Sequence, residues 1–230
     1  MAKKSNKALV LLSGGLDSTV CLSICKKLGL KIYAMSFDYG QRHKSELFFA
    51  KWQAKFHRCI SHKIFKIDWY GGSALTDEID IPNNKDVESI PKEIPVTYVP
   101  SRNIIFLSFA SGYAESVGIS DIYIGVNSVD YSGYPDCRKE FIVAFEKLIN
   151  FSTKKGLHGQ KFNIITPLIN LKKKEIVLIG KENGINFEKT ASCYNPNNKE
   201  SCGLCDSCLL RKKGFKEARV LDPIKYRKDV

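Results

Sequence analysis

The chain has 230 residues, of which 43% are hydrophobic, and a formal net charge of +12 at pH 7. This is enough for one main domain with a sizeable core, and no apolar run approaches the roughly 20 residues that span a bilayer. Residues 8–12 are too short a run for a secretory signal, so we expect a cytoplasmic protein without membrane association. Basic residues crowd both ends of the chain, and scattered lysines serve solubility more often than nucleic-acid binding.

Apolar runs rich in β-branched residues alternate with helical patterns along the first half of the chain. The pattern predicts strands at residues 8–12, 31–37, 61–67 and 122–126, and helices at about 17–28, 44–57 and 103–117. Such alternation is typical of a doubly wound parallel α/β sheet covered on both faces. We therefore predict this fold class for a main domain over residues 1–190. A small cysteine-rich, metal-binding region with a C-terminal helix packed on it is predicted over 191–230.

Residues 69–95 interrupt this alternation. The segment holds Gly71, Gly72, three prolines and a series of acidic residues. This composition predicts a surface loop. An ordered lid over residues 72–94 and a plain mobile insertion both fit the composition, and the mobile insertion is the more common of the two.

The first predicted strand ends in the sequence Ser13-Gly14-Gly15-Leu16-Asp17-Ser18. In a parallel α/β sheet, ligands bind beyond the carboxyl ends of the strands, and glycines there permit positive φ and close approach of the backbone to a ligand. Backbone N–H groups followed by a helix N-terminus favour an anion, most naturally phosphate. Ser13 and Ser18 add hydroxyl donors, whereas Asp17 beside phosphate would require Mg²⁺ between the two.

A tight turn capped by Asp17 or Ser18 is the simpler explanation of two glycines taken alone. The whole six-residue sequence, at a strand-to-helix turn, favours the phosphate loop instead. It is not a Walker-type loop, because no Gly-Lys-Ser/Thr follows.

Two further polar stretches are expected at the same edge of the sheet. Asp38, Gln41, Arg42 and His43 follow the second strand; Arg42 can pair with phosphate, and His43 can exchange protons near neutral pH. A helix cap with a surface histidine explains these residues equally well in isolation. Arg102, at the start of the third predicted helix, is a second candidate for contact with ATP or with a substrate carboxylate.

The stretch at residues 125–138 is too polar for a core and mixes aromatic with charged side chains. A flat heterocycle stacks on an aromatic face, and a guanine-like edge presents two N–H donors that one carboxylate accepts. Asp130 or Asp136 fits that role, and Arg138 fits an anion; an ordered polar loop is the alternative. The candidate substrate-binding residues are Arg42, Asn127, Asp130, Tyr131, Tyr134, Asp136 and Arg138.

Four of the eight cysteines lie close together near the C-terminus: Cys193, Cys202, Cys205 and Cys208. Four thiolates at such short separations close a tetrahedron around Zn²⁺ with no open position, which makes the site structural. The Cys-x2-Cys-x2-Cys spacing also suits an iron–sulfur cluster. The clustering predicts a metal in a reducing compartment rather than disulfides.

Together these stretches resemble the 7-cyano-7-deazaguanine synthases of queuosine biosynthesis, which belong to the N-type ATP pyrophosphatases of the PP-loop superfamily and have the adenine nucleotide alpha hydrolase-like fold. Residues 13–18 are similar to that family's pyrophosphate loop, 38–43 to its Tyr-Gly-Gln-Arg-His segment, 125–138 to its deazapurine loop, and the four cysteines to its zinc site.

The resemblance implies a ligase that forms carbon–nitrogen bonds. It would convert 7-carboxy-7-deazaguanine and ammonia into the nitrile through an acyl-adenylate and an amide, splitting ATP to AMP and pyrophosphate. The resemblance also implies Mg²⁺ with the ATP, bound Zn²⁺, a homodimer and no requirement for nucleic acid.

The same resemblance assigns roles to particular residues. The catalytic residues are Ser13, Asp17, Ser18, His43 and Arg102. The ATP-binding residues are Leu11, Leu12, Ser13, Gly14, Gly15, Leu16, Asp17, Ser18, Thr19, Val20, Cys21 and Asp38. This chain departs from the family pattern at Ser101 and Pro196, where the family usually has glycine.

Two other functions remain open on the sequence alone. A tRNA-modifying PP-loop enzyme would use the basic ends to hold RNA, but a thiolating enzyme of that kind would need a free catalytic cysteine near the loop. Cys21 and Cys25 are expected in the core face of a helix. A non-catalytic zinc module that binds nucleic acid would have no need of the glycine loop.

Overall fold

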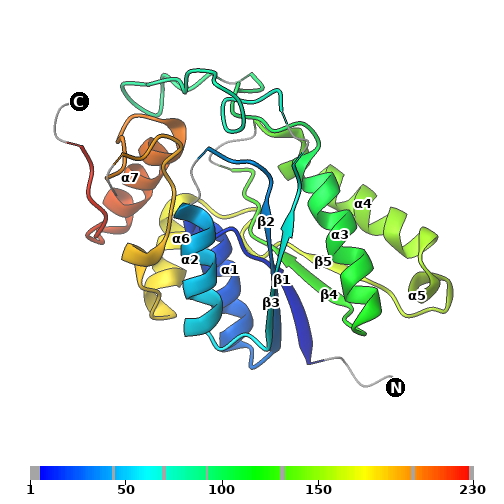
Figure 1. Cartoon of the computed structure of the whole chain (residues 1–230). Helices are drawn as coiled ribbons and strands as arrows, with labels where there is room; N and C mark the ends of the chain where they lie inside the picture. Colours follow the sequence, from blue (N-terminus) through cyan, green and yellow to red (C-terminus); the bar gives the residue numbers. More distant parts are fainter. Residues whose placement is uncertain are drawn as a thin grey trace.

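A computed structural model of the chain describes residues 6–42, 45–68, 71–91, 93–129, 133–197 and 200–227. Five parallel strands form one sheet in the order β3-β2-β1-β4-β5, with helices on both faces (Figure 1). The doubly wound α/β fold predicted from the sequence is thereby confirmed. Within the described residues, no helix is both long and apolar enough to cross a membrane.

The strands are β1 (Lys7–Leu11), β2 (Lys31–Asp38), β3 (Ser61–Lys66), β4 (Asp121–Ile124) and β5 (Asn163–Ile165). The helices are α1 (Leu16–Lys27), α2 (Ser45–Phe56), α3 (Arg102–Ser116), α4 (Lys139–Ser152), α5 (Lys154–Leu157), α6 (Lys173–Glu182) and α7 (Asp206–Ala218), with 3₁₀ turns at Pro135–Cys137 and Phe187–Lys189. Every strand and helix predicted above is present with ends close to those expected. The sequence patterns do not predict β5 or helices α4 to α6.

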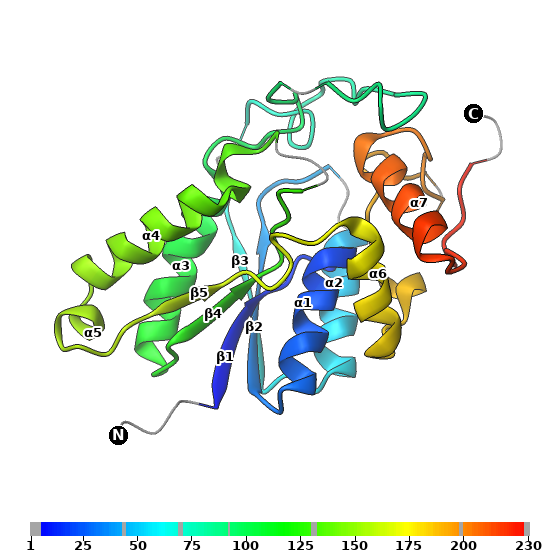
Figure 2. The same cartoon turned by 180° about the vertical axis from the view of Figure 1, so that it is seen from behind.

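The side chains of β1 alternate between two hydrophobic cores. Leu9 and Leu11 face the core formed with α3 and α4, whereas Ala8 and Val10 face the core formed with α1, α2, α6 and α7. Figures 1 and 2 show these two helical layers on opposite faces of the sheet. Because both faces are covered, the central strand is a continuous apolar run in the sequence.

The described part of the segment between β3 and α3 contains turns and bends but no helix or strand. It passes over the carboxyl end of the sheet and reaches the region of α7 (Figure 1). Asn84 attaches it there, because its N–H donates to the carbonyl of Leu204 at 3.0 Å and its Nδ2 donates to Oδ1 of Asp206 at 2.6 Å. The predicted surface loop is therefore fastened at its middle to the cysteine-rich region.

The C-terminal region packs closely on the main domain. Arg211 is only 1% exposed, and its guanidinium donates to Asp222 at 2.9 Å, to Thr190 at 2.8 Å and to Ser192 at 3.1 Å. The N–H of Ala191 donates to the carbonyl of Gly14 at 3.0 Å. The domain boundary at residue 190 stays a prediction. Residues on the two sides of that boundary are in close contact through Arg211 and Ala191.

Candidate active site

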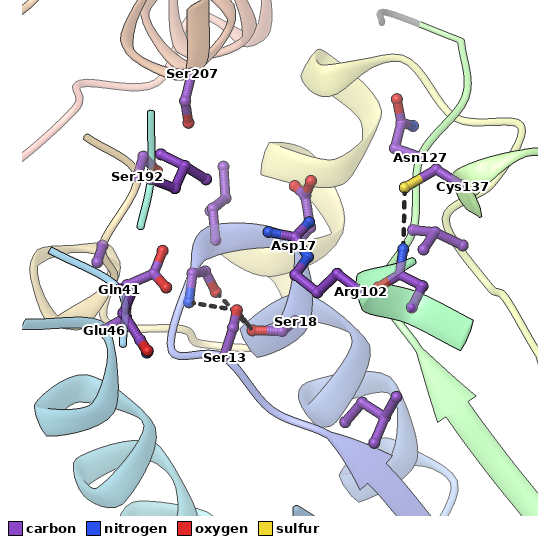
Figure 3. A pocket seen from close by; sticks show the side chains of 18 of the residues that line it. Ser13, Asp17, Ser18, Gln41, Glu46, Arg102, Asn127, Cys137, Ser192 and Ser207 are labelled. Carbon is purple, nitrogen blue, oxygen red and sulfur yellow. Dashed lines mark hydrogen bonds between the residues drawn. The ribbon is translucent and has the colours of Figure 1, made fainter. Parts of the chain in front are cut away.

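The loop between β1 and α1 is shaped by hydrogen bonds among its own residues. Oγ of Ser13 lies 3.0 Å from Oγ of Ser18 and accepts the N–H of Gly15 at 3.2 Å, while Oγ of Ser18 donates to the carbonyl of Gly15 at 3.1 Å (Figure 3). Among the described residues no side chain caps the start of α1. The N-terminus of this helix is therefore open to an anionic ligand.

Gly14 is required by the close approach of α2. Its φ is +88°, and a Cβ built on it would lie 2.2 Å from the carbonyl oxygen of Glu46 and 2.6 Å from the nitrogen of Ala50. Both contacts are with backbone atoms, which cannot move aside as a flexible side chain would. Any other residue would have to separate the loop from α2 and would also adopt an unfavourable φ.

A cavity of about 320 Å³ opens beside this loop at the carboxyl edge of the sheet. Its wall combines the ends of β1, β2 and β4 with the first turns of α1 and α3 and with residues of the C-terminal region. The predicted site residues in this wall are Leu11, Leu12, Ser13, Gly15, Leu16, Asp17, Ser18, Arg42, Arg102, Asn127, Tyr134 and Cys193.

The remaining described site residues do not line the cavity. The ATP-binding prediction extends into α1 as far as Thr19, Val20 and Cys21, which are all 0% exposed in the core. The others outside the wall are Gly14, Asp38, Asp136, Arg138 and three of the four predicted metal ligands, Cys202, Cys205 and Cys208. His43, Asp130 and Tyr131 lie outside the described residues.

Asp136 is engaged at the start of α3. Its Oδ2 accepts the N–H of Asn103 at 2.9 Å, its carbonyl accepts Nδ2 of Asn103 at 3.0 Å, and the residue is 4% exposed. A carboxylate at this position satisfies a first-turn N–H of the helix and interacts favourably with the helix dipole. The structure thus gives Asp136 a capping contact, and its proposed contact with the base stays a prediction.

Arg102 enters the cavity from an unusual backbone turn. Ser101, which precedes it, has φ 54° and ψ 22°, in the left-handed region that favours glycine. The N–H of Ser101 donates to the hydroxyl of Tyr98 at 3.0 Å. The guanidinium of Arg102 lies 5.9 Å from the ring centroid of Tyr134, also in the cavity wall. The left-handed turn explains why glycine is usual at position 101 in the family that the sequence resembles.

Lys173 is a cavity residue that the sequence reasoning missed. Its Nζ donates to both carboxylate oxygens of Asp17, at 2.8 and 2.7 Å. Asn127 fixes the turn before α6, because its Nδ2 donates to the carbonyls of Leu168 and Leu171 at 3.0 and 2.5 Å. The available signal for Lys173 was the run of three lysines at residues 172–174, which does not by itself show which lysine faces the site.

Glu46 is a second missed residue of the cavity wall. It lies in the first turn of α2 and is half-buried. Burial of its carboxyl group raises the pKa to about 7, and the positive charge of Arg102 opposes this rise only in part.

The four C-terminal cysteines are brought together and buried. Their Sγ atoms all lie within 4.8 Å of one another, and Cys205 and Cys208 are 0% exposed. Backbone N–H groups point at the sulfurs: Cys202 donates to Cys193 at 3.1 Å and Cys205 to Cys202 at 3.4 Å. Such donors stabilise thiolates, so the arrangement fits a bound metal ion. None of the eight cysteines forms a disulfide.

The cysteine cluster adjoins the cavity through Tyr194. The N–H of Tyr194 donates to Sγ of Cys205 at 3.5 Å, and its hydroxyl lies 3.4 Å from that of Tyr134. Tyr134 in turn lies 2.8 Å from Oγ1 of Thr97, in the segment that follows β3. The cluster thus supports one wall of the cavity.

The parallel sheet, with the glycine loop beside a cavity at its carboxyl edge, has the architecture of the PP-loop ATPase fold class. Two solved structures share the fold: NMN synthetase from Francisella tularensis (TM-score 0.50, 14% identity, covering 95% of this chain and 79% of that one) and a 4-thiouridine synthetase in complex with RNA and ATP (TM-score 0.50, 20% identity, covering 91% and 53%).

The chain belongs to the QueC family, because the family model of the queuosine biosynthesis protein QueC matches residues 7–219. It is 57% identical to the 7-cyano-7-deazaguanine synthase of Acetivibrio thermocellus, over 96% of this chain and 97% of that protein. It is 55% identical to the synthase of Geotalea uraniireducens, over 96% of each. The family resemblance found in the sequence is confirmed.

Proposed function

We propose that the chain converts 7-carboxy-7-deazaguanine and ammonia into 7-cyano-7-deazaguanine at the expense of ATP, with release of AMP and pyrophosphate. Relatives with this activity in their names, at 57% and 55% identity over nearly the whole chain, support the proposal. The structural observation that carries it is the position of the 13–18 loop beside a cavity that also contains Arg102 and Tyr134.

The proposed reaction begins with activation of a carboxylate, which resists attack by an amine. The substrate carboxylate attacks the α-phosphorus of ATP, and pyrophosphate leaves to give an acyl-adenylate. Ammonia then displaces AMP and forms the amide. A second ATP adenylates the amide oxygen, and loss of AMP leaves the nitrile. Positioning and charge stabilisation dominate such chemistry.

The loop residues would hold the phosphates of ATP. Backbone N–H groups at the start of α1, with the hydroxyls of Ser13 and Ser18, suit the leaving pyrophosphate. Asp17 would hold Mg²⁺ beside the phosphates, and the guanidinium of Arg102 would stabilise the negative charge that develops on transfer. His43 stays a proposal for proton exchange.

The substrate would occupy the part of the cavity near Asn127 and Tyr134. Tyr134 offers an aromatic face for the flat base, and Arg42 offers a positive charge. Asp130 and Tyr131 lie between Asn127 and Tyr134 in the sequence. A carboxylate there would accept the two N–H donors of the guanine-like edge.

Zn²⁺ is the metal that we propose for the four cysteines. Four thiolates leave no open coordination position, so the ion would supply folding energy rather than chemistry. Eight free cysteines also favour a reducing compartment, and we infer that the protein works in the cytoplasm.

We also propose a homodimer built on the outer face of α2. Phe48 and Phe56 are 64% and 52% exposed on this helix, and Trp52 between them stacks on Phe56 with ring centroids 4.8 Å apart. Spacings of four residues place these three aromatic side chains on one face. The adjacent strand β3 is an edge strand, so this side of the sheet is open to a second copy.

Mass spectrometry of the product tests the proposed function. Purified protein with 7-carboxy-7-deazaguanine, ATP, Mg²⁺ and ammonium should give the nitrile, with AMP and pyrophosphate as the nucleotide products. Turnover should change little between about 50 and 200 mM salt, where RNA-dependent activity would fall by orders of magnitude. ADP as the only nucleotide product would contradict the proposal and the pyrophosphatase class itself. An absolute requirement for tRNA would contradict the proposal and favour a tRNA-modifying PP-loop enzyme.

A further inference from the structure

Glu46 is a carboxyl group in the cavity wall for which the reaction scheme above has no role. Its backbone carbonyl lies against Gly14, so the residue borders the loop that would hold pyrophosphate. Figure 3 shows Glu46 and Gln41 on one side of the pocket and Arg102, Asn127 and Cys137 on the other. Within the described residues its carboxyl group makes no hydrogen bond or salt bridge.

The surroundings of Glu46 shift the pKa of its carboxyl group into the range in which it can exchange a proton at neutral pH. Burial raises its pKa to about 7, with Arg102 from α3 opposing the rise. The other charged or titratable groups of the described cavity wall are Asp17, Tyr39, Arg42, Tyr134, Lys173, Cys193, Tyr194, Asp206 and Arg211, together with Cys137. A group with a pKa near the working pH is present in both protonation states, which is the condition for efficient general base catalysis.

Amide formation requires a base of this kind. Ammonia exists in neutral solution almost entirely as ammonium, which has no lone pair with which to attack the acyl-adenylate. A carboxylate beside anionic phosphates is repelled by them, and a bound cation removes that repulsion. Ammonium supplies both the cation and the proton to be removed.

We propose that the carboxylate of Glu46 binds ammonium and removes one proton from it, so that the ammonia formed attacks the acyl carbon of the adenylate. The electrons of the broken N–H bond stay on nitrogen and form the new C–N bond. The C–O bond to AMP breaks, and AMP leaves with that electron pair. The second proton that nitrogen loses passes to the AMP phosphate or to water. This inference rests on the proposed function and assigns its ammonium site.

The variant Glu46→Gln keeps the size of the side chain and removes its basicity. Exchange of labelled pyrophosphate into ATP, measured with 7-carboxy-7-deazaguanine and without ammonium, reports adenylation alone. We expect this exchange to stay within about threefold of the wild-type rate, whereas amide formation from ammonium falls about 100-fold or more. Glu140→Gln, at an exposed position of α4 outside the cavity wall, is the matched control and should leave both rates unchanged.

Hydroxylamine separates loss of the base from loss of the adenylate. It is uncharged at neutral pH and attacks without a base, so hydroxamate should form at similar rates in the wild type and in E46Q. For total ammonium, kcat/KM of the wild type should be nearly level above about pH 7 and fall below it, whereas in E46Q it should rise about tenfold per pH unit, because only free ammonia reacts.

Four outcomes would contradict the assignment of Glu46, and the last of them would contradict the proposed function as well. Loss of pyrophosphate exchange in E46Q would place the side chain at ATP or its metal, and an equal loss of hydroxamate would show a general defect. Normal ammonium use in E46Q would contradict this inference alone. Absence of exchange in the wild-type protein would instead contradict the proposed function, and the ammonium site with it.

Discussion

Lys173 holds the carboxylate of Asp17 from across the site, with hydrogen bonds of 2.8 Å to Oδ1 and 2.7 Å to Oδ2 that join the first turns of α6 and α1. The two side chains are 14% and 27% exposed, so water screens the pair only in part. This contact places a positive charge at the phosphate loop and ties the loop's helix to the C-terminal half of the chain.

Breaking this pair should destabilise the protein. We expect Asp17→Asn to lower the free energy of unfolding by about 1–2 kcal/mol, and the double variant with Lys173→Met to cost less than the sum of the two single changes. Urea denaturation of the four proteins measures this coupling. The exposed pair Lys66 and Asp68, at 3.5 Å, is the control and should show no measurable coupling. Additive effects of Asp17 and Lys173 would disprove the prediction.

Gly14→Ala tests the contact between the phosphate loop and α2. With the loop in its present position, the new Cβ would clash with backbone atoms of α2, and alanine would have to adopt a φ of +88°. We therefore expect the loop to move away from α2. We expect pyrophosphate exchange to fall about 100-fold or more, while the circular dichroism spectrum still shows the α/β fold. Gly29→Ala has a similar φ of +70° but open space around it, and it should leave exchange unchanged.

Ser101→Gly should stabilise the chain. Serine is strained at the left-handed φ of position 101, and relief of this strain exceeds the entropy cost of glycine. We therefore expect the free energy of unfolding to rise by about 0.5–1 kcal/mol. The bond from the backbone N–H to Tyr98 remains available in the variant. Thermal unfolding measures the gain, and Ser101→Val should shift the midpoint downward. A lower midpoint for the glycine variant would mean that the serine side chain contributes more than its backbone strain costs.

The cysteine cluster should contain one zinc ion per chain after anaerobic purification, measured by elemental analysis. Removing the ion, or changing Cys205 to Ser, should lower the unfolding midpoint and the yield of folded protein before it lowers turnover of the folded fraction. Tyr194 contacts both Cys205 and Tyr134. Loss of the metal should therefore also weaken the affinity of the protein for 7-carboxy-7-deazaguanine. Iron with acid-labile sulfide would identify an iron–sulfur cluster instead.

The aromatic face of α2 should control association. We expect the wild-type chain to sediment as a dimer, and Phe48→Glu with Phe56→Glu to sediment as a monomer with unchanged secondary structure. Phe151→Glu changes a 79% exposed side chain on α4 and serves as the control. A wild-type monomer at micromolar concentration, or a dimer that survives the double change, would rule out this interface.

The parts of the molecule that could be predicted are those coded by short stretches of sequence. The run at 8–12 forms β1 because both of its faces are covered, and residues 13–18 form the loop because glycine permits a backbone that other residues resist. The four cysteines meet because their spacing is short. The strand β5 escaped prediction because three residues give no usable pattern.

Residues whose importance depends on packing could not be predicted. In the sequence, nothing distinguishes Lys173 from its two lysine neighbours; its contact with Asp17 depends on the orientation of α6. Likewise, nothing distinguishes Glu46 from other acidic residues in a first helical turn; its position in the cavity wall depends on the packing of α2. Asp136 shows the reverse case. Its place in a polar loop favoured contact with a base, whereas its observed contact caps α3 through Asn103.

The hydrogen bond from Ala191 to Gly14 has a consequence for how the protein comes into being. The phosphate loop leaves the ribosome well before the strip of chain that lies against it, because Ala191 is far from Gly14 in the sequence. Fragments that stop before residue 191 would lack this support, together with Arg211 and the cysteine cluster. We therefore expect chains that stop before residue 191 to be inactive, so that ATP would be consumed only by molecules in which the C-terminal region has been made and has packed against the loop.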